Sequence, residues 1–209
     1  AEEPGTLIKP VEDVAAFRDL LDDPRKNAVL VGPGAGLTKA TSENVLAALA
    51  AGKTVVIDAD GLSIFADASE TLIEAITGPC LLTPHEGEFK RLFSVDGDKP
   101  TRARAAAKLT GAVVLLKGAD TVIAEKKGRA VINASGTPDL ATAGSGDVLA
   151  GMALGLMTQG MDPFDAGCAA AWLHGALAED IGPGLIAEDL PAKLPGILRQ
   201  LRSTADTKP

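Results

Sequence analysis

The chain has 209 residues, of which 46% are hydrophobic and 23% are charged, a balance typical of one large globular domain. Its net charge of −8 is not offset by any basic stripe, which argues against nucleic acid as a partner. The sequence has no apolar run of about 18 residues and no signal-peptide pattern at its start, so we expect a cytoplasmic protein without a membrane partner.

Short aliphatic runs and amphipathic runs alternate over the first half of the chain. The aliphatic runs are typical of strands buried on both faces of a parallel sheet: 28–32, 54–58, 80–83 and 113–117. The amphipathic runs predict helices: 11–22, 39–51, 69–76 and 101–109. This alternation indicates βαβ crossovers, and hence an α/β fold with a mostly parallel central sheet.

The second half of the chain follows a different pattern. Residues 121–125 and 129–133 flank the turn sequence KKG, which predicts a β-hairpin after the parallel strands. Three helices are then predicted: 147–157, 163–180 and 190–201. Pro191 and Pro195 limit the regularity of the last one, and the final residues, 203–209, are expected to fray. No internal repeat or long linker divides the chain, so we expect a single domain over residues 1–209.

The loops that follow the predicted strands form the candidate site, because ligands collect beyond the carboxyl ends of parallel strands. Each loop is rich in glycine and polar residues: PGAG, ADGL, PHEGE and GADT. Gly32, Gly34 and Gly36 allow the backbone to approach a flat or anionic group, although a tight strand-to-helix turn also favours glycine. Asp58 and Asp60 can hold a metal or a hydroxyl-bearing substrate, or act as caps and turn formers.

The third and fourth loops carry further candidate ligands. His85 can donate a hydrogen bond to a ligand near neutral pH. Glu88, with Glu86 nearby, can orient a water or a Mg2+ ion that carries phosphates, although carboxylates are also common in the first turn of a helix. Lys117, followed by Gly118, can reach the phosphates or the ribose of a nucleotide from the end of its strand.

Three other side chains are expected to be structural. His174 lies among alanines and leucines in a predicted helix, which favours a packed histidine over a ligand. Cys80 falls in a predicted strand and Cys168 in an alanine-rich helix, far apart in the sequence. We therefore expect buried thiols rather than a disulfide.

The most informative stretch is 133–155, in which a glycine-rich loop leads directly into an apolar helix. Amides near Gly144, Ser145 and Gly146, with those of the first helical turn, can converge on an anion at the positive end of the helix dipole. Asp147 would repel that anion, so we interpret it as a base that takes a proton from a hydroxyl while a phosphoryl group arrives. The alternative is that Asp147 only caps the helix.

Five motifs resemble, in order, those of the ADP- or ATP-dependent NAD(P)H-hydrate dehydratases of the ribokinase-like superfamily: GPGAG, VIDADGL, LLTPHEGEF, KGADT and GTPDLATAGSGDVLAG. The resemblance covers about residues 29–180 and implies a three-layer α/β/α fold that repairs hydrated NADH and NADPH with ADP or ATP and Mg2+. It implies that Asp147, His85 and Gly34 bind the hydrate, and it assigns no residue as a metal ligand. The residues expected to bind the nucleotide are Lys117, Gly118, Ala119, Asp120, Thr121, Gly144, Ser145 and Gly146. Tetramers are usual in the family, so we expect a homotetramer.

The chain departs from the family pattern in two places. Ala143 stands where family members usually have glycine, a change that can stiffen the loop. The family domain also begins some tens of residues earlier, with a strand–helix segment that completes the sheet and lines the hydrate pocket. Either the chain is part of a longer polypeptide that carries an epimerase domain, or this N-terminal segment is missing. In both cases we expect an unpaired strand at one edge of the sheet.

Two other functions remain as alternatives. A ribokinase-like kinase acting on a thiazole or pyrimidine alcohol would use the same Asp147 and glycine cradle. A generic sugar kinase usually has Asn where His85 stands, so the TPHEGE motif favours the dehydratase. A non-catalytic nucleotide-binding module would bind the nucleotide without turnover.

Overall fold

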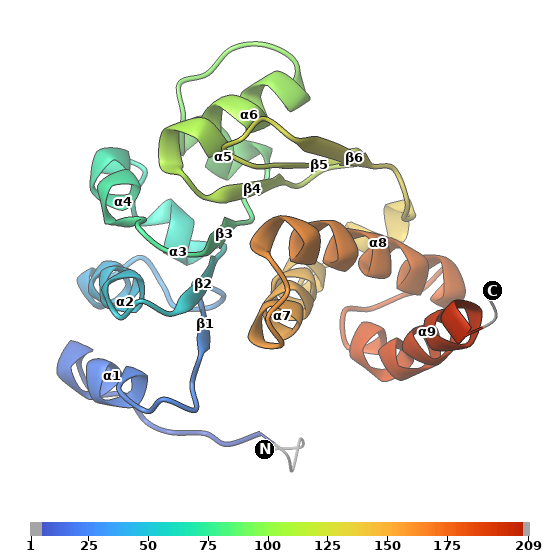
Figure 1. The fold of residues 1–209 in the computed structure, drawn as a ribbon, viewed down its shortest axis with the longest axis horizontal. Helices are drawn as coiled ribbons and strands as arrows, with labels where there is room; N and C mark the ends of the chain where they lie inside the picture. The colour runs from blue at the N-terminus through green and yellow to red at the C-terminus, as the bar shows by residue number, and fades with distance from the viewer. Residues whose placement is uncertain (1–5, 207–209) are drawn as a thin grey trace.

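The computed structural model describes residues 6–206, and its centre is a six-stranded sheet whose strands follow chain order (Figure 1). The strands are Ala28–Val31 (β1), Thr54–Ile57 (β2), Cys80–Leu82 (β3), Val113–Leu116 (β4), Thr121–Ala124 (β5) and Ala130–Asn133 (β6). β1 to β4 are parallel, whereas β5 pairs antiparallel with β4, and β6 with β5. The predicted mostly parallel sheet and the hairpin that follows it are both confirmed.

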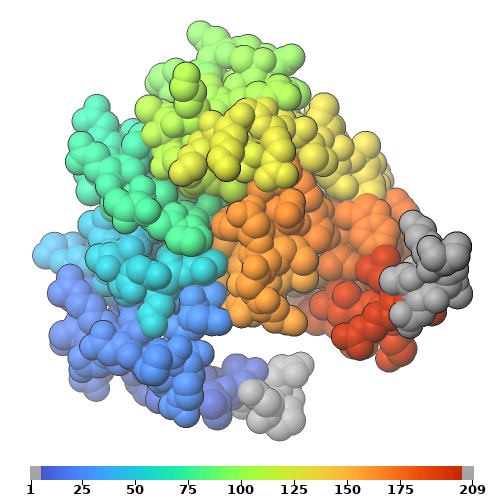
Figure 2. Space-filling model, viewed as in Figure 1, coloured from blue at the N-terminus to red at the C-terminus, as the bar shows by residue number. Residues whose placement is uncertain are grey.

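Helices connect and cover these strands. Their bounds are Val14–Leu21 (α1), Lys39–Ala50 (α2), Asp60–Ser63 (α3), Ser69–Ala75 (α4), Glu86–Leu92 (α5), Lys99–Thr110 (α6), Ser145–Thr158 (α7), Pro163–Ile181 (α8) and Asp189–Asp206 (α9), with a 3-10 turn at Pro138–Leu140. In Figure 1, α2, α4 and α6 lie on one side of the sheet, and α7 and α8 lie on the other. Figure 2 shows the same division on the surface, where the orange and red C-terminal residues are set apart from the blue to green ones. The fold is therefore a three-layer α/β/α arrangement.

Alternating strand side chains fill two separate cores. Val55 and Ile57 of β2 pack with α2, α4 and α6, whereas Val56, between them, packs with α7 and α8. In β3, Leu82 and Leu81 divide in the same way. Successive side chains of a strand point to opposite faces, so an uninterrupted apolar strand needs helices on both sides.

The structure also corrects the prediction at several elements. The short helix α3 and the 3-10 turn at Pro138–Leu140 were not expected, because neither is long enough to show helical periodicity. α9 was expected to be irregular after 190, yet it is continuous with Pro195 inside it, because its apolar side packs on α8. The predicted fraying of 203–209 is wrong for the part that α9 includes, and residues 207–209 lie outside the described chain.

The first strand lies at one edge of the sheet. Among residues 6–206, β1 pairs only with β2, which confirms the expected unpaired edge. None of the helices in this part of the chain combines the length and the apolar character that a membrane span requires.

The first loop depends on the absence of a side chain at Gly32. This residue has φ +133, and a Cβ atom built on it would lie 1.7 Å from the carbonyl oxygen of Asp58. Gly61 is confined in the same contact, since its Cβ would lie 2.7 Å from the carbonyl oxygen of Val31. Two glycines therefore let the loops after β1 and β2 meet backbone to backbone.

We expect Gly32→Ala to lower the free energy of unfolding by about 3 kcal/mol or more, because the new methyl group must displace backbone in addition to adopting a disfavoured φ. Gly52→Ala is the matched control, with φ +64 and nothing within 4 Å of the added Cβ. It should cost only about 1–2 kcal/mol. Urea unfolding of both variants makes the comparison, and equal losses would contradict the importance of the Gly32 contact.

Candidate functional site

The loops that follow the parallel strands are joined to one another at the carboxyl ends of these strands, as the sequence predicts. The Gly36 amide donates a 2.8 Å hydrogen bond to the Asp60 carboxylate, which ties the first loop to the second. The Lys117 amide donates to the Pro84 carbonyl at 2.8 Å, which ties the fourth loop to the third. The amino end of α7 lies at the same end of the strands, since Gly146 is next to the ammonium group of Lys117.

The first turn of α7 is open to an anion. Gly144 precedes it with φ 83 and no side chain caps the helix. The amides of Gly146 and Asp147, in the first turn, therefore have no acceptor in the described part of the chain. Five of the other helices are each capped by a side chain at their amino end: Asp13, Thr38, His85, Asp98 and Asp162. Free donors and the helix dipole at one point favour a negatively charged ligand.

Asp147 is the third residue of α7 and is exposed. Its carboxylate makes no hydrogen bond and no ion pair with residues 6–206, and the cap position belongs to Gly144. The interpretation of Asp147 as a simple helix cap is therefore wrong. A free carboxylate beside unpaired amides is suited to take a proton from a ligand that binds there.

A buried ion pair places a cation next to these amides. Lys117 Nζ lies 2.6 Å from Asp58 Oδ1, with the Asp58 side chain 1% exposed and the Lys117 side chain 19% exposed. A Cβ atom built on Gly146 would lie 3.4 Å from the same Nζ. The anion site of α7 thus combines backbone donors with one ammonium group. Asp58 itself, considered above as a metal or substrate ligand, is engaged with Lys117.

His85 caps α5 through one nitrogen of its half-exposed ring, and its other nitrogen, Nε2, lies 3.5 Å from Glu88 Oε1. Its Nδ1 accepts hydrogen bonds from the amides of Gly87 at 2.8 Å and Glu88 at 3.2 Å. Nδ1 is therefore unprotonated and the proton of the neutral ring lies on Nε2. The ring is about half exposed, so the Nε2–H group can donate to a ligand. Glu88 completes the capping box by accepting from the His85 amide at 2.8 Å, which supports its structural role.

Lys99 shapes the loop that joins β4 to β5. Its Nζ donates to the carbonyl and to the carboxylate of Asp120, at 2.7 and 3.0 Å. This hydrogen bond lowers the pKa of the Asp120 carboxyl. Next to it, the bidentate bond from Arg102 lowers the pKa of Glu86, which the sequence had left as a possible neighbour of a water or ion. No spacing in the sequence indicates these pairs, because α6 brings their members together.

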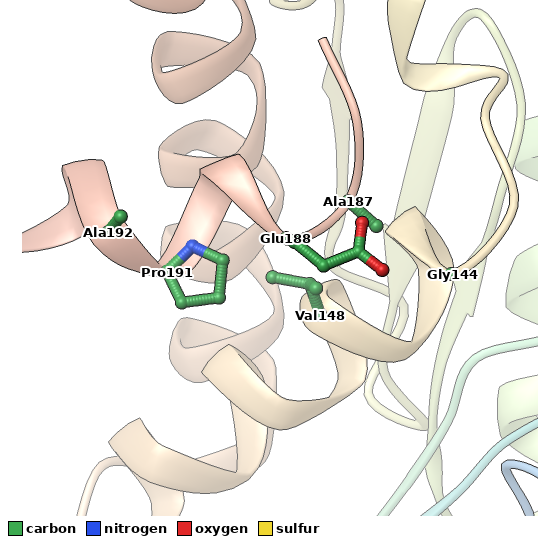
Figure 3. A pocket seen from close by; sticks show the side chains of 6 residues that line it. All are labelled: Gly144, Val148, Ala187, Glu188, Pro191 and Ala192. Carbon is green, nitrogen blue, oxygen red and sulfur yellow. The ribbon is translucent and has the colours of Figure 1, made fainter. Parts of the chain in front are cut away.

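A groove beside Gly144 was also missed by sequence reasoning. It encloses about 520 Å³ and is lined by Gly144, Val148, Ala187, Glu188, Pro191 and Ala192. The Glu188 carboxylate projects from this lining toward the turn at Gly144 (Figure 3). Ala187 and Glu188 come from the connection between α8 and α9, and Pro191 and Ala192 from the first turn of α9, a stretch that carries no recognisable motif. The groove exists only because α9 folds back beside α7.

A family model described as NAD(P)H-hydrate dehydratase matches residues 4–197 of the chain. The chain belongs to the NAD(P)H-hydrate dehydratase family. The ADP-dependent (S)-NAD(P)H-hydrate dehydratase of Neisseria meningitidis is 35% identical to it over 212 residues, covering 96% of this chain and 69% of that protein. The bifunctional NAD(P)H-hydrate repair enzyme of Salinibacter ruber is 42% identical over 180 residues, covering 82% of this chain and 33% of that protein. The chain thus spans about a third of the length of the bifunctional relatives that it matches.

Solved structures support the same family. The ADP/ATP-dependent NAD(P)H-hydrate dehydratase from Bacillus subtilis, co-crystallised with ATP/Mg2+, is similar with a TM-score of 0.77 at 32% identity, over 88% of this chain and 69% of that one. A ribokinase-like superfamily protein from Enterococcus faecalis has a TM-score of 0.73 at 25% identity, over 90% and 66% of the two chains. The ribokinase-like fold that the motifs implied is confirmed.

The predicted binding residues of this NAD(P)H-hydrate dehydratase family member differ in how they face the site. Gly34 and Ala119 are exposed in their loops. The Ser145 hydroxyl instead donates to the Leu140 carbonyl at 2.6 Å, so its side chain supports the loop from behind. The Thr121 hydroxyl likewise donates to a carbonyl of its own loop, that of Gly118, at 3.1 Å. Both hydroxyl hydrogens are therefore engaged within the chain.

The residues predicted to be structural behave largely as expected in this dehydratase-family chain. His174 is buried, and its Nε2 has no hydrogen-bond partner among the described residues. Burial lowers the pKa of His174 to about 4, and the charge of Lys117 contributes in the same direction. Cys80 and Cys168 are free thiols, and burial raises the pKa of Cys80 to about 12. Cys168 is only half-buried, because it lies at the margin of the α7–α8 core.

We expect His174 to make the folded chain less stable in mild acid. The unfolded chain takes up this proton near pH 6.5, whereas the folded chain resists it down to about pH 4. The contribution of His174 is therefore fully present above about pH 6.5 and is lost as the pH falls toward 4. Between about pH 7.5 and pH 5 the loss should be about 2 kcal/mol.

Urea unfolding of the unsubstituted chain and of His174→Gln at both pH values measures this effect. The variant should show a smaller drop in stability, by about the same 2 kcal/mol. An equal drop in the two proteins would contradict the assignment of the pH dependence to His174.

Proposed function

We propose that this chain catalyses the adenine-nucleotide-dependent dehydration of hydrated NADH and NADPH, and that residues 1–209 act as a single dehydratase domain. The observation that carries the proposal is the meeting of the uncapped α7 terminus, the free carboxylate of Asp147 and the ammonium group of Lys117. Family membership supports the same activity, since the Neisseria relative is described as an ADP-dependent (S)-NAD(P)H-hydrate dehydratase.

The nucleotide is proposed to lie across the amino end of α7. Its phosphates accept from the free amides of the first turn of α7, those of Gly146 and Asp147, and Lys117 neutralises part of their charge. The groove beside Gly144, with its apolar Val148 and Pro191, is the place for the base. The exposed loop of residues 118–120, which follows Lys117 and is held by Lys99, is proposed to contact the ribose or the phosphates.

The hydrated nicotinamide is proposed to lie between His85, Asp147 and the loop at Gly34. The Nε2–H group of His85 is proposed to donate to the substrate, because Nδ1 is engaged by the amides of Gly87 and Glu88. Gly34 is exposed and a Cβ atom there would meet nothing within 4 Å, so its backbone is accessible to the ring. This leaves the Asp147 carboxylate next to the hydroxyl group that must react.

The chemistry follows from the poor leaving ability of hydroxide. Asp147 accepts the hydroxyl proton while the terminal phosphoryl group moves to that oxygen, giving a phosphate ester and releasing AMP from ADP, or ADP from ATP. The lone pair of the ring nitrogen then expels phosphate, and the neighbouring ring carbon loses a proton to restore the dihydropyridine. The protein positions the two ligands and stabilises the moving charge through the α7 amides and Lys117.

Mg2+ is proposed to arrive with the nucleotide. Within the described residues, no three His, Cys, Asp or Glu side chains gather around one point. Mg2+ usually keeps several waters and takes further ligands from substrate phosphates, so it does not require a full set of protein ligands. When bound, it neutralises phosphate charge. Glu88, whose Oε1 lies 3.5 Å from His85 Nε2, would accept a hydrogen bond from one of its waters.

We also propose a cytoplasmic homotetramer. Two free thiols suit a reducing compartment. Val131 and Ile132 of the edge strand β6 and Trp172 of α8 are exposed, which leaves apolar surface for other subunits to cover. Sedimentation equilibrium measures the number of subunits.

The activity is tested directly by supplying hydrated NADH with ADP or ATP. We expect the near-ultraviolet absorbance of NADH to return only when both ligands are present, with release of phosphate. Stable phosphorylation of a thiazole or pyrimidine alcohol, without recovery of NADH, would instead favour a ribokinase-like kinase. Nucleotide binding without turnover of any of these substrates would favour a non-catalytic module.

Asp147→Asn is expected to lower kcat roughly 10²- to 10⁴-fold, because the amide cannot accept the hydroxyl proton. Nucleotide affinity and the unfolding temperature should change little. Asp165→Asn is the matched control, since Asp165 occupies the same third position in α8 and is exposed. Near-normal turnover in Asp147→Asn, or an equal loss in Asp165→Asn, would refute the role of Asp147 as the base.

A further inference from the structure

Asp58 is the most deeply buried charged side chain at the site, and the proposed reaction does not use it directly. Its residue is 0% exposed, and its Oδ1 lies 2.6 Å from Lys117 Nζ. Its Oδ2 is also inaccessible to solvent and has no partner among the described residues. One oxygen is therefore used by Lys117 and the other is closed off, so Asp58 reaches a ligand only through Lys117.

The backbone around Asp58 is fixed on both sides. Its amide donates to the Val31 carbonyl at 3.2 Å, and its carbonyl accepts from the Gly61 amide at 3.0 Å. Gly32 packs against the same carbonyl too closely for any side chain. Ala59, the next residue, has φ 48, the only positive φ of a non-glycine residue in the described chain. A conformation this constrained holds the Asp58 carboxylate at one place and orientation.

Lys117 needs such an anchor. A lysine side chain has four rotatable bonds and a strongly hydrated ammonium group, so it does not keep one position without a partner. Here its amide is tied to the Pro84 carbonyl, and its Nζ lies between Asp58 and Gly146. The buried Asp58–Lys117 pair is not a strong source of stability. Removing two charges from water costs free energy, and their attraction offsets this cost only with good geometry.

We propose that Asp58 is a positioning residue that holds the Lys117 ammonium group beside Gly146, ready for the terminal phosphate of the nucleotide. This inference rests on the proposed nucleotide-dependent function and adds a residue to it. The Lys117 ammonium group is then already in place before the nucleotide binds. Binding therefore does not have to restrict the lysine side chain, a loss of entropy that would reduce the affinity for phosphate.

The test is a double-mutant cycle on Asp58→Asn, Lys117→Met and the double variant. Isothermal titration measures the affinity of each protein for ADP and for adenosine, with and without Mg2+, and thermal unfolding confirms that each is folded. Adenosine has no phosphates, so the ratio of the two affinities isolates the phosphate contribution.

Lys117→Met should lower the ADP-to-adenosine affinity ratio roughly ten- to a hundredfold, the loss of a charge-assisted contact. Asp58→Asn should lower it roughly three- to thirtyfold, as the lysine regains its rotamers. The decisive expectation is that Asp58→Asn has no further effect on this ratio in the Lys117→Met background.

Glu43→Gln is the control, because Glu43 makes an exposed 2.9 Å ion pair with Lys39 on α2 and should leave the ratio unchanged. An unchanged or raised ratio in Asp58→Asn would overturn the inference while leaving the proposed function intact. Additive effects, or an effect of Asp58→Asn seen only with Mg2+, would overturn it in favour of an independent or metal-linked role. Absence of ADP binding by the unsubstituted protein would overturn the proposed function and the inference together.

Discussion

The close approach of Gly32 to the carbonyl oxygen of Asp58 fixes the geometry on which the rest of the site depends. It locks the loops after β1 and β2 together and holds the Asp58 carboxylate in place. Asp58 in turn binds Lys117, at the end of β4, and Lys117 lies beside Gly146 at the start of α7. A series of contacts thus joins the loop after the edge strand β1 to the amino end of α7, which packs on one face of the sheet.

Several local departures from ordinary protein structure gather at this place. α7 begins without a side-chain cap, Ala59 has a positive φ, and one oxygen of Asp58 and one nitrogen of His174 are buried without partners in the described chain. By contrast, α2, α6 and α8 each have a side-chain cap at the amino end, and a further orphaned atom, on Asn44, lies on α2. Stable folds concentrate such departures where function requires them.

The proposed function requires an acidic chain to bind an acidic ligand. Free backbone amides and a helix dipole favour an anion at the start of α7, so the net charge of −8 need not be reversed by a cluster of basic side chains. The ammonium group of Lys117 then adds one positive charge next to Gly146. Asp147 also lies in this first turn of α7. Its carboxylate has no cation as a partner in the described chain, so it is free to act as a base.

The sequence by itself determined the strands, most helices and the loops at the carboxyl ends of the strands, because apolar periodicity, glycine and motif spacing are local properties of the chain. It also singled out Asp147, His85 and Lys117 as candidate site residues. It missed α3, the continuity of α9, the Lys99–Asp120 pair and the groove at Ala187 and Pro191, and it left Asp58 between several roles. Only the tertiary structure decided these. Each depends on which segments far apart in the sequence are packed together, and no short pattern of residues encodes the partner across that distance.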